Sequence, residues 1–283
     1  LLRPLHYIRS DGVQPQDGWR KVKVPYYELL NPEGFMVKNV GRVHSPRLSD
    51  INKRGYMSYQ FALSTLLLTP QAMFEDVAKV TGQENPYEAL SEEEKATINT
   101  FDLLSMSKES QAEMIAALAF FIDAPLEYDE AHHAVLVNKT EVGDKILIDG
   151  SITRDNWAEI CDICLQTAYI DQKREENLKF KNEAARKFYE RFQKKKAEYE
   201  KSKRKGYKSN PDLELGNIIS ALATNHNSLN YTNIYDLTVY QVHDTFNRQN
   251  IKKQNEIHDM NYAVWGGEND LGGWYKRMET DKQ

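Results

Sequence analysis

A lysine-rich segment interrupts the apolar pattern of this chain between residues 173 and 208. It holds 15 Lys or Arg and 6 Asp or Glu, whereas the rest of the 283-residue chain holds 22 basic and 36 acidic side chains. Side chains as charged as these stay mostly in contact with water. We therefore expect two folded parts of acidic character that are joined by one basic segment.

The first part, residues 1–170, is predicted to be a mixed α+β body with extended arms. Its N-terminal 54 residues are rich in turn-forming Gly and Pro, and the alternating runs at 19–30 and 34–43 predict strands or extended arms. From Ser58 the apolar residues recur with a helical period. Helices are expected at about 58–69, 71–80, 91–104, 108–122 and 155–169.

A β-hairpin is expected within residues 126–150 of this body. The alternation of apolar and polar residues places Val135 and Val137 opposite Ile146 and Ile148. The turn of this hairpin is expected at residues 141–144.

The second part, residues 210–283, is predicted to be a helical C-terminal region, and residues 171–209 a basic helix that links it to the body. Asn210-Pro211-Asp212 resembles the start of a helix. Asp236 is a candidate cap for a last helix that ends near Gly266. The first of these helices carries an apolar stripe at the spacing of one helical face: Leu215, Ile218, Ile219 and Leu222.

Two motifs resemble metal or redox sites, and neither is predicted to be one. Cys161 and Cys164 form a Cys-x-x-Cys pair, but a zinc site needs two more ligands and the chain has no further cysteine. Both fall on the apolar face of a predicted helix, where cysteine packs as a small hydrophobic residue. His132 and His133 lie in a predicted strand, so their side chains point to opposite faces.

No catalytic residue, cofactor or metal is predicted, because the chain has no phosphate-binding loop and no nucleophile elbow. We therefore expect a protein that is not an enzyme. No run of about 18 apolar residues occurs, so a transmembrane helix and a membrane partner are not expected either.

The basic segment supports two hypotheses. Lys and Arg can neutralise phosphates, and Tyr or Phe can stack on bases, which predicts a nucleic-acid-binding helix. Alternatively, Ala185, Phe188, Phe192 and Tyr199 form one apolar stripe while acidic residues alternate with the lysines, which favours a solvated helix that docks one narrow face. The basic residues singled out for either role are Lys187, Arg191, Lys194, Lys195 and Lys196.

Residues 221–246 raise the question of an active site, because three polar residues, 225–227, precede many large apolar ones. Asn can end a helix, so capping explains the polar residues. The large residues exceed what one small helical face can bury, so either the body or another chain must cover them. The residues predicted to bind a partner are Leu229, Tyr231, Ile234, Tyr235, Leu237 and Tyr240.

The stretch "LELGNIISALATNHNSLNYTNIYDLTVYQVHDTF" resembles a C-terminal signature of uncharacterised proteins that tailed bacteriophages encode in structural gene clusters. "WAEICDICLQTAYI" and the lysine-rich helix precede it in the same order, so the similarity covers about residues 156–248. Such proteins look like tail-assembly chaperones in size and in their helical C-terminal half. The residues after Arg248 depart from the pattern.

This resemblance implies a non-enzymatic phage morphogenesis protein. It would act in tail assembly in the host cytoplasm, through contacts with other tail or virion proteins and through self-association. A permanent structural part of the virion and a nucleic-acid-binding module are the alternatives.

Overall fold

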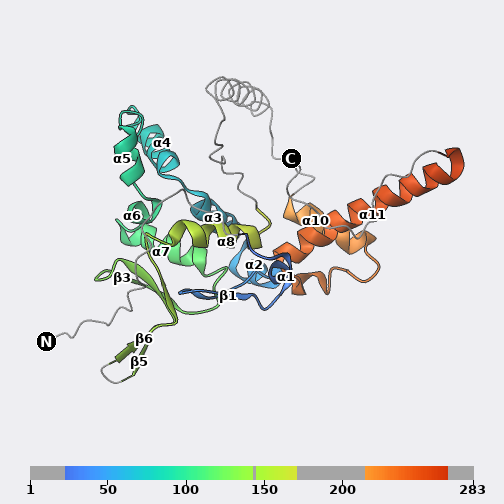
Figure 1. Ribbon diagram of the computed structural model, residues 1–283, viewed down its shortest axis with the longest axis horizontal. Helices are drawn as coiled ribbons and strands as arrows, with labels where there is room; N and C mark the ends of the chain where they lie inside the picture. Colours follow the sequence, from blue (N-terminus) through green and yellow to red (C-terminus); the bar gives the residue numbers. More distant parts are fainter. Residues whose placement is uncertain (1–22, 143–144, 171–213, 267–283) are drawn as a thin grey trace, which may run out of the picture.

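The computed structural model describes residues 23–142, 145–170 and 214–266, and it confirms the α+β fold class with a helical C-terminal region (Figure 1). The first half contains α1 (Tyr26–Leu30), β1 (Phe35–Val37), β2 (Gly41–Val43), α2 (Leu48–Arg54), α3 (Tyr56–Leu67), α4 (Pro70–Thr81), α5 (Glu92–Thr97), α6 (Thr100–Leu104) and α7 (Lys108–Leu118). The remainder contains β3 (Leu126–Asp129), β4 (Ala134–Val137), β5 (Thr140–Val142), β6 (Lys145–Leu147), β7 (Gly150–Ile152), α8 (Trp157–Thr167), α10 (Leu215–Asn225), the 3-10 turn η2 (Ile234–Asp236) and α11 (Val239–Trp265).

Side-chain caps set the starts of several helices. Ser91 and Glu94 form the predicted capping box of α5, and Ser107 caps α7 as predicted. The single helix expected at 91–104 is wrong, because the chain leaves helical geometry at Ile98. Asn99 then accepts a hydrogen bond from the backbone N–H of Phe101 and starts α6.

The strands of the described residues form three small antiparallel sheets, β1–β2, β3–β4–β7 and β5–β6. The predicted pairing of Val135 and Val137 with residues 146 and 148 is wrong. Val135 pairs instead with Tyr128 on one side and Ile152 on the other. Strand β6 pairs with the polar strand β5 in a separate hairpin, which projects beyond the larger sheet (Figure 1). Residues 126–128 and 146–148 both carry apolar residues two positions apart, and 150–152 offers only Ile152, so alternation alone could not select the partner.

Two further predictions, at residues 26–30 and at residues 132–133, are wrong. Residues 26–30 form helix α1 rather than a strand, whereas 35–43 form the hairpin β1–β2. His132 and His133 lie in the tight turn between β3 and β4, not in a strand, and His133 has a positive φ. His132 Nδ1 contacts the Asp129 carboxylate, so this turn is held by local contacts.

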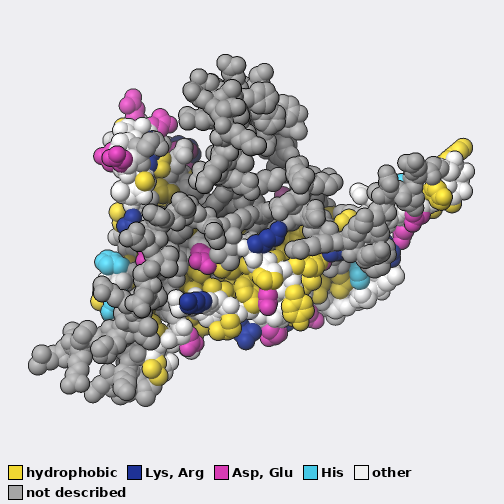
Figure 2. Space-filling view, viewed as in Figure 1, with side chains coloured by type: hydrophobic (Ala, Val, Ile, Leu, Met, Phe, Trp, Pro, Cys, Tyr) yellow, Lys and Arg dark blue, Asp and Glu magenta, His cyan; other side chains and the backbone are white. Residues whose placement is uncertain are grey.

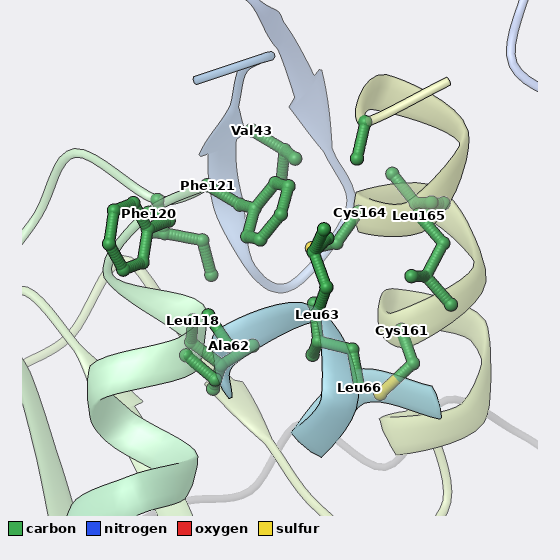
Figure 3. Close-up of a cluster of buried hydrophobic side chains, with 14 of the residues drawn as sticks. Val43, Ala62, Leu63, Leu66, Leu118, Phe120, Phe121, Cys161, Cys164 and Leu165 are labelled. Carbon is green, nitrogen blue, oxygen red and sulfur yellow. The ribbon is translucent and has the colours of Figure 1, made fainter. Parts of the chain in front are cut away.

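The core of the body lies where α3 packs against α7 and α8 (Figure 3). Cys161 and Cys164 are free thiols buried in this core, as the sequence predicted. Figure 3 shows them on α8, facing Leu63 and Leu66 of α3. Burial raises the pKa of the Cys164 thiol above its usual range, so the thiol is protonated and unreactive at neutral pH.

The C-terminal helices share this core with the body. The backbone N–H of Leu48 donates to the carbonyl of Leu237 (3.0 Å), and the N–H of Val239 donates to the carbonyl of Pro46 (2.8 Å). The Ser45 hydroxyl accepts a third hydrogen bond, from the N–H of Tyr240 (3.1 Å). We call these contacts of residues 45–48 with 237–240 the clasp.

Helix α11 begins at the clasp. Thr238 caps it, in a capping box with Gln241, so the prediction of Asp236 as the cap is wrong. Asp236 instead belongs to the turn η2. The predicted end at Gly266 is confirmed. Within the described residues, no helix has both the length and the apolar composition needed to cross a bilayer.

Candidate interaction surface on the C-terminal helices

Helix α11 has an anchored half and a free half. The anchored half, about residues 239–248, lies against α1, α10 and the end of α8. The other half extends away from the rest of the described structure (Figure 1). A helix that extends from a folded body without neighbours is marginally stable in water by itself. The anchored half therefore has to fix the direction of the whole helix.

Aromatic and polar side chains hold the anchored half. The Tyr26 hydroxyl donates a hydrogen bond to Asp244 Oδ1 (2.8 Å) and accepts one from Arg248 Nη2 (3.2 Å). On the other side, the Tyr169 ring stacks on the His243 ring, with centroids 5.0 Å apart. Because Tyr26 and Tyr169 together contact three side chains of α11, α1 and the residues that follow α8 fix its orientation.

Burial is the main cause of the pKa shifts of Tyr26, Tyr169 and His243 in this cluster. Burial raises the pKa of Tyr26, and the hydrogen bond to Asp244 adds to that shift although Arg248 opposes it. Burial also raises the pKa of Tyr169 and lowers that of His243, so His243 is held neutral. These groups bond to one another rather than to an open cavity, which is typical of a structural network.

The free half of α11 carries exposed apolar residues on the same face that is buried in the anchored half. Val239, Val242 and Phe246 face the core, and the stripe continues at about the same angle around the helix. We define the distal surface as Ile257, Met260, Val264 and the adjoining Trp265, which is 84% exposed. Figure 2 shows apolar side chains gathered at this tip. Spacings of three and four residues are those of a helix that docks into a groove.

The structure separates the residues that the sequence predicted to bind a partner. Ile234 and Tyr240 are buried in the core of the protein itself, and Leu229 and Leu237 pack against it. Tyr231 and Tyr235 remain exposed, at 57% and 37%. A role in partner binding therefore stays a prediction for these two tyrosines, and the body covers the others.

The polar joint before them has the structural role that the sequence predicted. Asn225 Nδ2 donates to the carbonyl of Ala221 at the end of α10 (3.1 Å). Asn233 Nδ2 donates to the carbonyl of Ser228 and so closes the loop that follows (2.8 Å). The five basic-helix residues, Lys187, Arg191, Lys194, Lys195 and Lys196, lie outside the described residues.

The sequence analysis did not predict the distal surface as a binding site, although the sequence carries a signal for it. Extending the stripe of Val242 and Phe246 by the helical period reaches Ile257, Met260 and Val264. The polar residues Asn250 and Lys253 interrupt the stripe and conceal this continuity.

Other parts of the described structure offer less chemistry. An open depression between β1–β2 and the end of β4 is lined by Lys38, Arg42, Asp123, Asn138 and Asp149. Asn138 Nδ2 donates to Asp149 Oδ2 there, so two of these polar groups satisfy each other. Within residues 23–142, 145–170 and 214–266, no group of three or more His, Cys, Asp or Glu is arranged to hold a metal ion.

Residues 203–279 match a family model described as the YomV second domain. YomV is a phage-type protein, so the match relates this part of the chain to a phage-associated domain family. It spans α10, η2 and the whole of α11, including the distal surface. Comparison with curated proteins and with solved structures gave no match.

Proposed function

We propose that this chain is a non-enzymatic bacteriophage morphogenesis protein that acts in tail assembly as a chaperone and binds another phage protein through the distal surface of α11. The observation that carries the proposal is the exposed apolar stripe on a helix whose base is rigidly anchored. The match of residues 203–279 to a phage-associated domain family supports the phage context.

The energetics of the distal surface suit a protein partner. Apolar surface of this kind gains free energy when it is removed from water, about 25 cal/mol for each Å². Large aromatic side chains such as Trp265 dominate binding energy when a partner buries them at an interface centre. Because the clasp and the contacts of Tyr26 and Tyr169 fix the base of α11, binding does not have to order the whole helix from a disordered state.

The test uses two aspartates placed on the distal surface, Ile257→Asp with Val264→Asp. The matched control carries the same added charge on the opposite side of the same helical turns, Asn255→Asp with Tyr262→Asp. Each form, with a purification tag, is expressed during phage infection, and co-purifying phage proteins are identified by mass spectrometry. We expect one tail protein to co-purify with the wild type and the control, and at least about tenfold less of it with the distal variant, a loss of about 1.4 kcal/mol or more.

Equal recovery of phage proteins by all three forms would contradict the proposed role of the distal surface. A second measurement, mass spectrometry of purified virions, distinguishes an assembly chaperone from a permanent structural component. An assembly chaperone is absent from the finished virion, whereas a permanent structural component is present in it in fixed proportion to the other structural proteins.

A further inference from the structure

Helix α3 has two apolar faces, although the described residues cover only one of them. No Asp, Glu, Lys or Arg occurs from residue 55 to residue 74. The inner face, which includes Tyr59, Leu63 and Leu66, is buried. Apolar side chains on a second helical face are typically covered by another element or chain. Its outer face is therefore expected to have a second neighbour.

We define the outer face of α3 as Met57, Phe61, Ser64 and Leu67. Met57 and Phe61 are 64% and 67% exposed, and no charged side chain lies between them. These residues recur at the spacing of one side of a helix, so they form a ridge about 15 Å long on a helix of about 18 Å, with Ser64 as its one polar member.

We propose that the outer face of α3 is the docking surface for the chain's own basic segment, residues 173–208. Where the described chain stops and resumes supports this occupant. Helix α8 packs along α3, and the described chain stops shortly after it, at Ile170. It resumes at Glu214, whose carboxylate acts electrostatically on Tyr56 at the start of α3: the pKa of Tyr56 is raised first by burial and next by Glu214.

The lengths agree with this arrangement. The apolar stripe of the basic segment runs from Ala185 to Tyr199, about 21 Å at 1.5 Å per residue if helical. This is close to the length of α3. Fourteen residues remain on each side of the stripe, enough to reach about 46 Å when extended. Because both ends are tethered, docking within the chain is favoured by a high effective concentration.

The charges agree as well. Helices α4 and α5 follow α3 directly, and residues 75–94 hold seven acidic side chains and one lysine. Figure 2 shows acidic side chains gathered over these helices. Because α4 follows α3 directly, this acidic lobe would attract a basic occupant of the outer face, with an attraction that salt limits to about 10 Å. The apolar ridge supplies the contact, and the acidic lobe favours a basic occupant.

Trypsin tests the proposal in the full-length protein, because the basic segment offers it many cleavage sites. Phe61→Asp places a charge on the ridge, and Phe192→Asp does the same on the stripe. Val80→Asp is the matched control, since Val80 is an exposed apolar residue of α4 outside the ridge. Cleavage sites within 185–199 are followed by mass spectrometry.

We expect cleavage at these sites to be at least about tenfold faster in both Phe→Asp variants than in the wild type, which corresponds to about 1.4 kcal/mol of lost docking free energy. Val80→Asp should be cleaved like the wild type. Because Phe61 is exposed, thermal melting should show that Phe61→Asp is folded.

Equal cleavage rates in all four proteins would overturn the proposal. So would a dimer that Phe61→Asp makes monomeric, as measured by light scattering, with no change in cleavage, because a second copy would then be the occupant. Neither outcome depends on the distal surface of α11, so this test can fail while the proposed function stands.

Discussion

Tyr240 gives the sharpest test of how α11 is attached to the body. Its side chain is 9% exposed, and its ring lies 5.1 Å from that of Tyr169 and 6.4 Å from that of Tyr26, measured between centroids. Replacing a buried aromatic residue by alanine typically costs about 3–5 kcal/mol, because packing is lost and a cavity remains. We expect a loss of this size for Tyr240→Ala. Total stabilities are about 5–15 kcal/mol, so the loss is a large fraction of the whole.

The assay is equilibrium unfolding in urea, followed by far-UV circular dichroism. With an m-value of about 3 kcal/mol/M, a loss of about 3–5 kcal/mol lowers the midpoint by about 1–1.7 M. Tyr240→Phe keeps the ring and should fall by much less. Tyr235→Ala serves as a surface control, with a change within about 0.5 kcal/mol. A wild-type midpoint for Tyr240→Ala, or an equal loss for Tyr235→Ala, would refute the assignment of Tyr240 to the core.

Three further predictions follow from burial and charge. The double change Cys161→Ala with Cys164→Ala should lower the free energy of unfolding by about 1–3 kcal/mol, measured in urea. Thiol reagents should react with the native protein far more slowly than with the unfolded one, and fast labelling of the native protein would contradict core packing. Burial lowers the pKa of His243, so the unfolded state binds more protons below about pH 6.5, and stability should decrease as the pH falls through that value; thermal melts of His243→Gln should lack this component, and an identical pH profile would argue against it. Changing residues 194–196 to Glu should alter only weak, salt-sensitive binding to DNA or RNA at about 150 mM salt, and submicromolar wild-type affinity there would favour the nucleic-acid-binding role instead.

Local patterns predicted much of the helical structure. The stripe containing Leu215, Ile218 and Leu222 is buried as expected, and Ser91 with Glu94 forms the expected capping box. These features depend on residues three to seven positions apart, so the sequence carries them directly. The start of α11 was placed too early because Asp236 and Thr238 are both good caps, and only the partner Gln241 distinguishes them.

Contacts between distant residues could not be predicted in the same way. Segments 126–128, 146–148 and 150–152 each offer an apolar partner for Val135, and alternation does not select among them. Tyr26 and Asp244 are separated by 218 positions, and nothing in either local sequence indicates the other. The same limitation applies to the residues that were predicted to bind a partner. Tyr231, Tyr235 and Tyr240 look alike in sequence, but contacts with distant residues of the body bury Tyr240 alone.

The clasp has a consequence for the order in which the chain folds during its synthesis. Ser45 and Tyr240 are 195 positions apart, so the residues around Ser45 leave the ribosome long before their partners exist. At about 5–20 residues per second, that interval is about 10–40 s. Throughout it the backbone groups of Pro46 and Leu48 must stay hydrated or bind elsewhere, and the apolar surface that α11 will cover stays open. The protein can therefore finish folding only after α11 has been synthesised.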